Sequence, residues 1–285
     1  MLIPGLSAIA DKYDALVCDV WGVLHNGRRA YPGVPEALAN FRAKGGHVLL
    51  LSNAPRPSDA LPVMFEQMGI PHDVYDGILT SGDATRLCLA SHEHGTRCYH
   101  IGPDRDLALF DETGVERVGE SDADFILVTG PFNDESEGPE DYREQFERLV
   151  ARGLTLICAN PDIVVERGDR HIYCAGALAK LYGELGGSTV YFGKPHGPVY
   201  DIARRRLAEF AGKSVPDARI LAVGDGPLTD IKGANDTGID ALFITGGIAA
   251  ADCGPAPEAP EEARVVHVLE RAGVSAVGAM PRLVW

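Results

Sequence analysis

The stretch ALVCDVWGVLHNG, residues 15–27, decides the fold prediction for this chain. Its first four residues are apolar and predict a short buried strand of a parallel sheet. Asp19 follows directly, and then come Trp21 and the turn-forming Gly22 and Gly27. In open α/β sheets, ligands bind at the carboxyl ends of strands. Asp19 is therefore a candidate nucleophile or metal ligand, and the alternative is a carboxylate that only caps the next turn.

Length and composition indicate a chain with a substantial core. The chain has 285 residues, of which 45% are hydrophobic, enough for one large or two modest domains. It contains no apolar run long enough to span a bilayer, and its first residues lack the pattern of a signal peptide. The six cysteines show no Cys-x-x-Cys spacing, which favours reduced thiols over a disulfide framework or a zinc site. We therefore expect a cytoplasmic protein with no membrane partner.

The formal net charge of −15 restricts the partners that we expect. No basic stripe offsets this charge, which argues against nucleic-acid binding. An anionic substrate can bind to this negatively charged protein only where a metal ion, a lysine or helix N-termini make the local electrostatic potential positive. A small phosphorylated metabolite is compatible with this charge only if the site supplies such groups.

Strand-like and helix-like segments alternate along the chain. A predicted helix over residues 36–44 is followed by a predicted strand over 47–53, and the alternation resumes with strands over 219–223 and 241–244. The Pro- and Ala-rich residues 248–262 are predicted to form a surface loop. This β-loop-α alternation predicts an α/β fold with a parallel sheet and helical crossovers.

Polar residues directly follow four of the predicted strands: Asp19; Ser52 and Asn53; Lys194; and Asp225, with Asp230 five residues later. If these strands are parallel neighbours, the polar groups meet at one edge of one sheet. Asp19 and Asp225 would form a carboxylate pair suited to Mg²⁺. With the metal bound, Asp19 can attack phosphorus without full repulsion between like charges.

The remaining groups suit the same phosphoryl transfer. Ser52 and nearby backbone N–H groups can hold phosphoryl oxygens, and Lys194 can offset the developing charge. Asp230 can orient a metal-bound water or Lys194. Taken singly, Ser52 could be a helix cap, Lys194 a surface charge and Asp225 part of an ordinary turn. The ordered set favours catalysis, because separate strand ends carry the groups that one mechanism needs.

This ordered set resembles the haloacid dehalogenase-like (HAD) phosphatase superfamily. The resemblance rests on four motifs: the strand ending in Asp at 17–23, the strand ending in Ser at 51–53, the lysine at 193–195, and Gly224–Asp225 with Asp230. The segment between the second and third motifs resembles the α/β cap of subclass IIA, the NagD-like group. That likeness rests on residues 81–85, 159–162 and 176–178.

The resemblance implies a Rossmann-like parallel-sheet HAD core with an inserted α/β cap domain of the type found in that subclass. The core would comprise residues 1–80 and 188–285, and the cap residues 81–187. It also implies a phosphoaspartyl intermediate on Asp19, with Mg²⁺ held by Asp19, Asp225 and the backbone carbonyl of Trp21. A homodimer formed through the cap is a further expectation from this group.

The cap of the resembling group supplies specificity contacts, so Asn160 and Asp162 are candidates for substrate binding beside Ser52, Asn53 and Lys194. A rigid turn is the alternative interpretation of the Asn-Pro-Asp sequence at 160–162. The substrate itself stays open among sugar phosphates, nucleotides, pyridoxal phosphate and phosphoglycolate.

Trp21 departs from the family pattern, in which a second Asp protonates the leaving group and later activates water. General acid–base help of this kind is worth about 10²–10⁴-fold in rate, and an indole cannot transfer the proton. A related subgroup has Asp-Val-Trp-Gly-Val at this position. Three interpretations stay open: substrates with good leaving groups such as aryl or acyl phosphates, a proton from another group, or binding of a phosphorylated ligand with little turnover. The candidates for another proton donor are His25, His196 and Asp162.

Overall fold

Strand β1 (Ala15–Asp19) lies inside a six-stranded sheet, and all five of its residues are buried. The computed structural model of the protein describes residues 1–167 and 170–285. These residues form two compact units. The first comprises Met1–Ser52, Asp59–Leu79 and Tyr200–Trp285, and the second comprises Asn53–Ser58 and Thr80–Val199.

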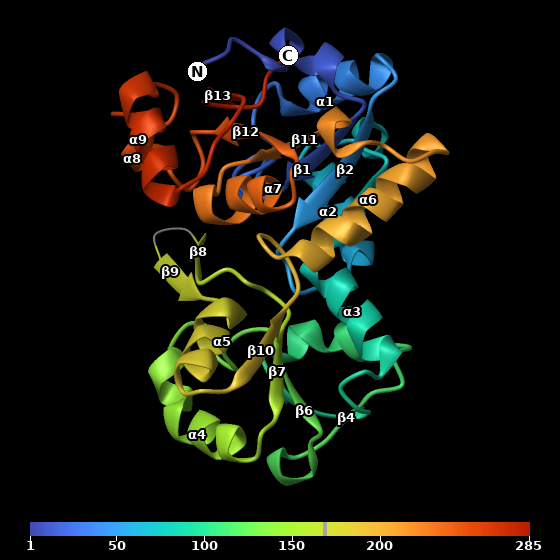
Figure 1. Ribbon diagram of the computed structural model, residues 1–285, viewed down its shortest axis with the longest axis vertical. Coiled ribbons are helices and arrows are strands. Elements are labelled where there is room, and N and C mark those ends of the chain that lie inside the picture. The colour runs from blue at the N-terminus through green and yellow to red at the C-terminus, as the bar shows by residue number, and fades with distance from the viewer. Residues whose placement is uncertain (168–169) are drawn as a thin grey trace. The chain divides into compact units, whose positions relative to one another are not determined.

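The first unit is built around the sheet with strand order β13-β12-β11-β1-β2-β3. Its other strands are β2 (His47–Ser52), β3 (Gly77–Thr80), β11 (Ile220–Gly224), β12 (Asp240–Ile244) and β13 (Gly278–Met280). Its helices are α1 (Val34–Ala43), α2 (Leu61–Gln67), most of α6 (Gly197–Ala211), α7 (Lys232–Asp236), α8 (Ala250–Cys253) and α9 (Glu262–Ala272). In Figure 1, β1 and β2 in blue lie beside β11 in orange, so distant parts of the chain form one sheet.

The register of this sheet places three of the predicted site residues, Asp19, Ser52 and Asp225, at one edge. In the parallel pairing of β1 with β2, Asp19 lies opposite Leu51, and Ser52 is the next residue of β2. In the parallel pairing of β1 with β11, Cys18 lies opposite Val223, so Asp225 follows β11 at the same edge. Because β2, β1 and β11 are parallel neighbours, their carboxyl ends bring these three side chains to the same edge of the sheet, as the strand-end pattern predicts.

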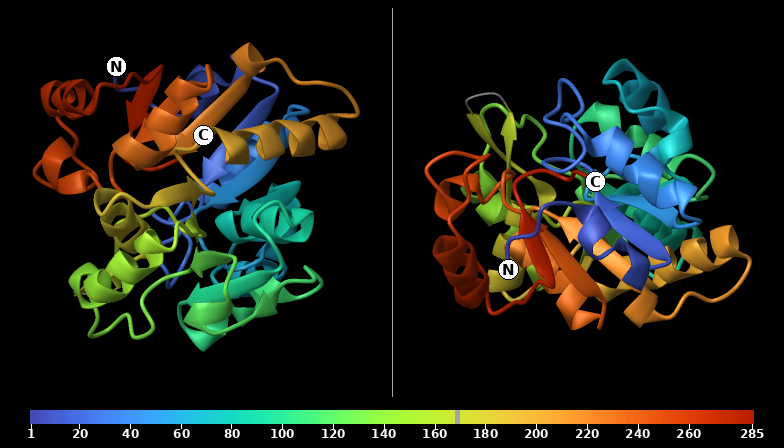
Figure 2. Two further views of the ribbon diagram at one scale, coloured as in Figure 1. Left: turned by 60° about the horizontal axis from the view of Figure 1, so that its bottom comes forward. Right: turned by 90° about the horizontal axis from the view of Figure 1, so that it is seen from above.

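The chain ends also meet in the first unit. The backbone N–H of Ile3 donates to the carbonyl of Ala279 at 3.0 Å, and Leu2 forms a parallel bridge to Ala279. The view from above in Figure 2 shows the blue N-terminal segment beside the red strand β13. This pairing protects the outer edge of β13, which would otherwise expose unpaired backbone groups.

The second unit has its own five-stranded parallel sheet, with strand order β10-β7-β6-β4-β5. Its strands are β4 (Arg97–Ile101), β5 (Glu116–Arg117), β6 (Phe125–Val128), β7 (Thr155–Cys158) and β10 (Ser188–Tyr191), with a hairpin of β8 (Val164–Arg167) and β9 (Arg170–Tyr173). Its α-helices are α3 (Ser81–Ser91), α4 (Arg143–Ala151) and α5 (Ala175–Glu184). Helix α3 begins with a capping box, in which Thr80 Oγ1 accepts from the Asp83 N–H and Asp83 Oδ2 accepts from the Thr80 N–H, both at 2.9 Å.

The two parallel sheets with their helices confirm the predicted α/β, Rossmann-like fold. One local prediction needs correction: helix α8 lies within residues 248–262, where the composition predicts a loop. The hairpin of β8 and β9 is a further element that the sequence analysis does not include. The assignment of residues 1–80 and 188–285 to the core and of residues 81–187 to the cap stays a prediction.

None of the helices in the described part of the chain combines the length and apolar character that crossing a bilayer requires.

Candidate active site

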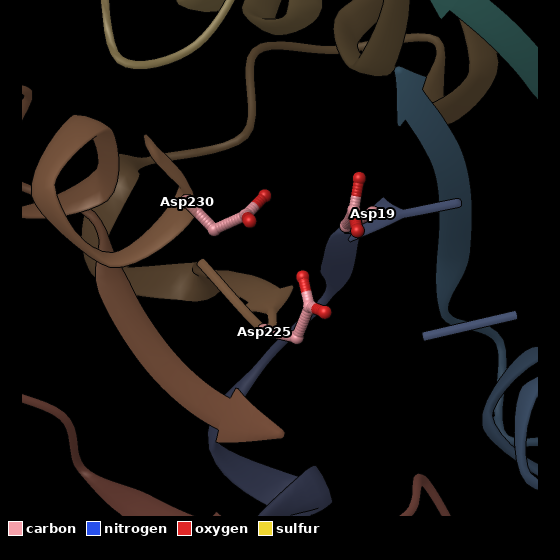
Figure 3. Close-up of side chains that lie close together, drawn as sticks. All are labelled: Asp19, Asp225 and Asp230. Atoms are coloured by element: carbon pink, nitrogen blue, oxygen red, sulfur yellow. The ribbon is translucent and has the colours of Figure 1, made fainter. Parts of the chain in front are cut away.

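Three buried carboxylates converge in the first unit (Figure 3). Asp19 ends β1, Asp225 directly follows β11, and Asp230 lies in the single-turn π-helix η9 (Pro227–Ile231). Their exposed fractions are 7%, 6% and 5%, and a carboxylate oxygen of each lies within 4.8 Å of the others. Buried like charges at this spacing repel one another strongly unless a cation or a proton is shared among them. The donor set therefore fits a divalent cation with oxygen ligands.

Backbone groups hold Asp225 from two sides. The N–H of Ile248 donates to Asp225 Oδ2 at 2.7 Å. A Cβ atom added to Gly22 would lie 2.0 Å from the same oxygen, and one added to Gly247 would lie 1.9 Å from it. Only glycine allows this approach, so the loops after β1 and β12 both pack directly on the carboxylate.

Asp230 closes the turn that joins β11 to α7. Its Oδ2 accepts from the Gly226 N–H at 3.1 Å and from Thr229 Oγ1 at 3.2 Å. Gly224 packs directly against the Asp230 side chain, because a Cβ added to Gly224 would be 2.1 Å from Asp230 Cβ. Single π-turns occur frequently at functional sites, and here the turn directs a carboxylate to the sheet edge.

Ser52 and Trp21 lie at the carboxyl ends of β2 and β1, at the same sheet edge as Asp19. Ser52 is the last residue of β2 and is buried. Trp21 lies two residues after Asp19, and half of its surface is exposed. A shallow hollow beside Arg42 and His47 lies at the opposite edge of the sheet, where β2 begins, and none of the predicted site residues lines it.

The other predicted site residues are grouped in the second unit. Asn53 Oδ1 accepts from the Lys194 N–H at 2.8 Å, and Asn53 Nδ2 donates to the Lys194 carbonyl at 3.0 Å. The same Nδ2 donates to Asp162 Oδ1 at 2.8 Å, and the Asp162 N–H donates to Asn160 Oδ1 at 3.1 Å. Asn53 therefore joins Lys194, which follows β10, to the segment that follows β7. Because β10 belongs to the five-stranded sheet, the prediction that Lys194 follows a strand of the same sheet as Asp19, Ser52 and Asp225 is wrong. Lys194 and Asn160 are both buried.

Comparisons with known proteins identify the family of this chain. The pattern of haloacid dehalogenase-like hydrolases matches residues 16–116, and a second HAD-hydrolase-like pattern matches residues 191–272. The crystal structure of a haloacid dehalogenase-like hydrolase from Brucella suis 1330 is 45% identical, with a TM-score of 0.87, and covers 99% of this chain and 100% of that one. This chain belongs to the haloacid dehalogenase-like family.

Two curated relatives of this haloacid dehalogenase-like hydrolase have assigned activities. Ribonucleotide monophosphatase NagD of Escherichia coli K12 is 27% identical over 83% of this chain and 89% of its own length. Phosphoglycolate phosphatase 1A of Arabidopsis thaliana chloroplasts is 25% identical over 88% of this chain and 73% of its own length. The chain is therefore an enzyme with NagD-like relatives.

His25 is a buried residue of the loop between Trp21 and Gly27 in this hydrolase. Its Nδ1 accepts from the Gly27 N–H at 2.9 Å, which places the proton of the neutral ring on Nε2. Nε2 is buried and has no hydrogen-bond partner among the described residues. Burial lowers the pKa of His25 to about 4. This placement favours a structural role for His25 over the role of proton donor that the sequence leaves open.

Sequence reasoning missed the contributions of Gly22, Gly247 and Ile248. A backbone N–H carries no side-chain signal, so Ile248 could not be identified by residue type. The available signal was positional, because residues 245–247 follow β12, the neighbour of β11 in the sheet. A glycine-containing loop at that strand end is expected to reach the same edge as Asp225.

Proposed function

We propose that this hydrolase is a Mg²⁺-dependent phosphatase that acts on a small phosphorylated metabolite, with Asp19 as the nucleophile. The observation that carries the proposal is the convergence of Asp19, Asp225 and Asp230 at the carboxyl edge of a parallel sheet. The phosphatase activities of the relatives NagD and phosphoglycolate phosphatase 1A support it. Because these two relatives act on different substrates, their names do not select one for this chain.

The first step transfers the phosphoryl group to Asp19. A carboxylate oxygen of Asp19 bonds to phosphorus, and the bond from phosphorus to the leaving oxygen breaks with its electron pair. Water then cleaves the resulting phosphoaspartyl group and restores the carboxylate. Mg²⁺ bound by Asp19, Asp225 and the Trp21 carbonyl would supply positive charge that offsets the phosphate charge. Asp230 holds the turn that follows Asp225 and orients the groups around it.

Polar residues are proposed to bind the phosphoryl group and the rest of the substrate. Ser52 is proposed to bind phosphoryl oxygens, and Lys194 to compensate the charge that develops during transfer, because their places in the motif order match these roles. Asn53, Asn160 and Asp162 complete the proposed substrate contacts. Their hydrogen bonds to one another and to Lys194 support a shared role. Because the cap lies between the second and third motifs in the same motif order, we propose that residues 81–187 form the cap.

Trp21 limits the leaving groups that this mechanism accepts. Without a carboxylic acid two residues after Asp19, the leaving oxygen departs with little or no proton assistance. We therefore propose that the enzyme acts on esters or anhydrides whose leaving groups are stable as anions. We also propose that the chain represents a subgroup in which Trp at this position is normal.

The test is phosphate release from a panel of aryl, acyl and alkyl phosphates with Mg²⁺. Removing the nucleophile with Asp19→Asn is expected to lower kcat by about 10³-fold or more on every substrate that the wild type hydrolyses. Asp11→Asn is the matched control, because this aspartate lies outside the site and its side chain is 83% exposed. Equal rates for wild type and Asp19→Asn would exclude Asp19 as the nucleophile.

The second candidate function is binding of a phosphorylated ligand with little turnover, and the absence of an acid at Trp21 is the observation that favours it. It predicts that the wild type binds phosphate esters in the presence of Mg²⁺ but releases phosphate from none of the panel. Calorimetric binding with the same compounds separates this outcome from an inactive preparation, which would neither bind nor hydrolyse them.

A further inference from the structure

Three large apolar side chains are exposed beside the buried carboxylates of the first unit. Trp21 is 50% exposed, and Leu228 and Ile248 are each 63% exposed. We call these three residues the apolar rim. Single exposed apolar residues are common on protein surfaces and need no explanation. The rim is different because each member belongs to a loop that contacts Asp225 or Asp230.

The contacts of the three loops place the rim around the carboxylates. Ile248 donates its own N–H to Asp225 Oδ2 at 2.7 Å. Trp21 precedes Gly22, whose Cα packs on the same oxygen. Leu228 lies in η9 between Asp225 and Asp230, next to Thr229, which donates to Asp230. Three loops that follow β1, β11 and β12 therefore contact Asp225 or Asp230, and each carries one of the exposed apolar side chains.

The Trp21 ring is supported from behind while its outer surface is exposed. It meets the ring of His25 edge-on, with centroids 5.4 Å apart and an interplanar angle of 77°. His25 in turn packs on Phe65, with ring centroids 5.8 Å apart. A Cβ on Gly27 would lie 2.5 Å from Trp21 Cη2, so the indole lies directly on glycine backbone. A ring fixed in this way loses little conformational freedom when a ligand stacks on it.

We propose that the apolar rim binds the leaving group of the substrate and that this leaving group is aromatic. The inference rests on the proposed phosphatase function and names the substrate class of that same site. Two independent properties of Trp21 point to this class. Its side chain cannot protonate a leaving oxygen, which requires a group that is stable as an anion, and its exposed indole provides a surface for ring stacking.

The step balances for an aryl phosphate. An oxygen of Asp19 forms a bond to phosphorus, the bond from phosphorus to the aryl oxygen breaks, and its electron pair leaves on the phenolate. The phenolate takes a proton from water after it departs. A second water then hydrolyses the phosphoaspartyl group, so that no protein acid is needed for the first step.

The kinetic test separates aromaticity from acidity of the leaving group. Phenyl phosphate is compared with hexafluoroisopropyl phosphate, an alkyl ester whose parent alcohol has an acidity close to that of phenol. Trp21→Leu is expected to raise KM for phenyl phosphate about 5- to 10-fold and to change KM for the alkyl ester less than about 2-fold. Trp21→Phe, which keeps a ring, is expected to restore KM for phenyl phosphate to within about 2-fold of the wild type.

The binding test does not depend on turnover. Phenylphosphonate and methylphosphonate are titrated calorimetrically into the Mg²⁺-loaded protein, and the ratio of their affinities is compared between wild type and Trp21→Leu. The ratio is expected to favour phenylphosphonate by about 10-fold in the wild type and to fall near unity in the variant. Trp285→Phe leaves Trp21 as the only tryptophan of the chain, so its fluorescence is expected to respond to phenylphosphonate and not to methylphosphonate.

Leu228→Ala and Val277→Ala complete the design as a matched pair of exposed apolar residues. Val277 donates its N–H to the carbonyl of Ala241 near the start of β12, at the sheet edge opposite the carboxylates. Only Leu228→Ala is expected to weaken phenylphosphonate binding. Equal effects of Trp21→Leu on both esters, or an unchanged phosphonate ratio, would overturn the rim as a binding surface. Failure of the wild type to release phosphate from any compound of the panel would instead overturn the phosphatase function and leave the phosphonate test valid.

Discussion

Gly22 lies directly against the carboxylate of Asp225. A Cβ on Gly22 would be 2.0 Å from Asp225 Oδ2, and the residue has φ of +89°. Asp225 cannot move away without leaving its 2.7 Å hydrogen bond to the Ile248 N–H. The loop after Asp19 thus packs closely on Asp225, the proposed metal ligand, because Gly22 has no side chain.

Gly22→Ala should therefore weaken Mg²⁺ binding. Gly45→Ala is the matched control, because Gly45 has φ of +86° and a Cβ there would have no neighbour within 4 Å. Both variants should lose about 1–2 kcal/mol of stability through left-handed backbone strain. Calorimetric Mg²⁺ titration should show lower affinity in Gly22→Ala alone. Equal Mg²⁺ affinities in the two variants would show that the contact with Asp225 is not required.

Mg²⁺ should stabilise the protein against unfolding through Asp225. A cation at 100 times its Kd adds about 2.7 kcal/mol to the free energy of unfolding. Asp225→Asn should lose most of this gain, whereas Asp201→Asn, with a side chain that is 73% exposed, should keep it. Without Mg²⁺, Asp225→Asn should be at least as stable as the wild type, because it removes one of three buried like charges. Thermal unfolding with and without Mg²⁺ measures both effects, and an identical Mg²⁺ response of wild type and Asp225→Asn contradicts the assignment.

Trp21→Asp should speed the hydrolysis of alkyl phosphates, because it supplies a proton for a poor leaving group. The gain is expected in kcat and to reach about 10²-fold, the lower end of what general acid catalysis provides. Trp21→Asn is the control, since its amide matches the carboxyl in shape and cannot donate a proton in this way. If both variants change kcat on alkyl phosphates equally, proton transfer is not the missing function.

Asn53→Ala should lower both activity and stability, because Asn53 bonds to the backbone N–H and carbonyl of Lys194. Removing a partner from two buried backbone groups costs about 1–3 kcal/mol. Asn235 makes the same pair of contacts to Ser275, at 2.7 and 3.0 Å, on an exposed surface. Asn235→Ala should therefore cost less stability and leave phosphate release unchanged. Comparable losses of activity in the two variants would argue against a role for Asn53 in positioning Lys194.

The free energy of unfolding should fall as the pH falls from 6.5 towards 4, in part through His100. Burial, with repulsion from Arg117, lowers the pKa of His100 from 6.5 to about 4, so the unfolded chain binds its proton first in this window. The stabilisation is complete above pH 6.5 and amounts to at most about 3 kcal/mol at 1.36 kcal/mol per pKa unit. Denaturant unfolding over this range should show a smaller slope in His100→Gln than in the wild type. His72→Gln, which changes an exposed ring, should keep the wild-type slope, and an unchanged slope in His100→Gln refutes the assignment.

The strand-end residues were predictable because their chemistry is local in the sequence. Asp19, Ser52 and Asp225 each follow an apolar run, and parallel strands place such positions at a common edge. Signals elsewhere are weaker. Strand β13 has three residues, and α8, β8 and β9 have four each, too few for a hydrophobic period to be recognised.

By itself, the sequence determined the α/β fold and the chemical groups of the site, because apolar periodicity and residue type are properties of short segments. Only the tertiary structure decided which backbone atoms hold Asp225 and which apolar side chains stay exposed around it. Those properties depend on contacts between loops that are far apart in the chain. The packing of Gly22 and Ile248 on one carboxylate, and the exposure of Trp21 beside it, exist only once β1, β11 and β12 lie side by side.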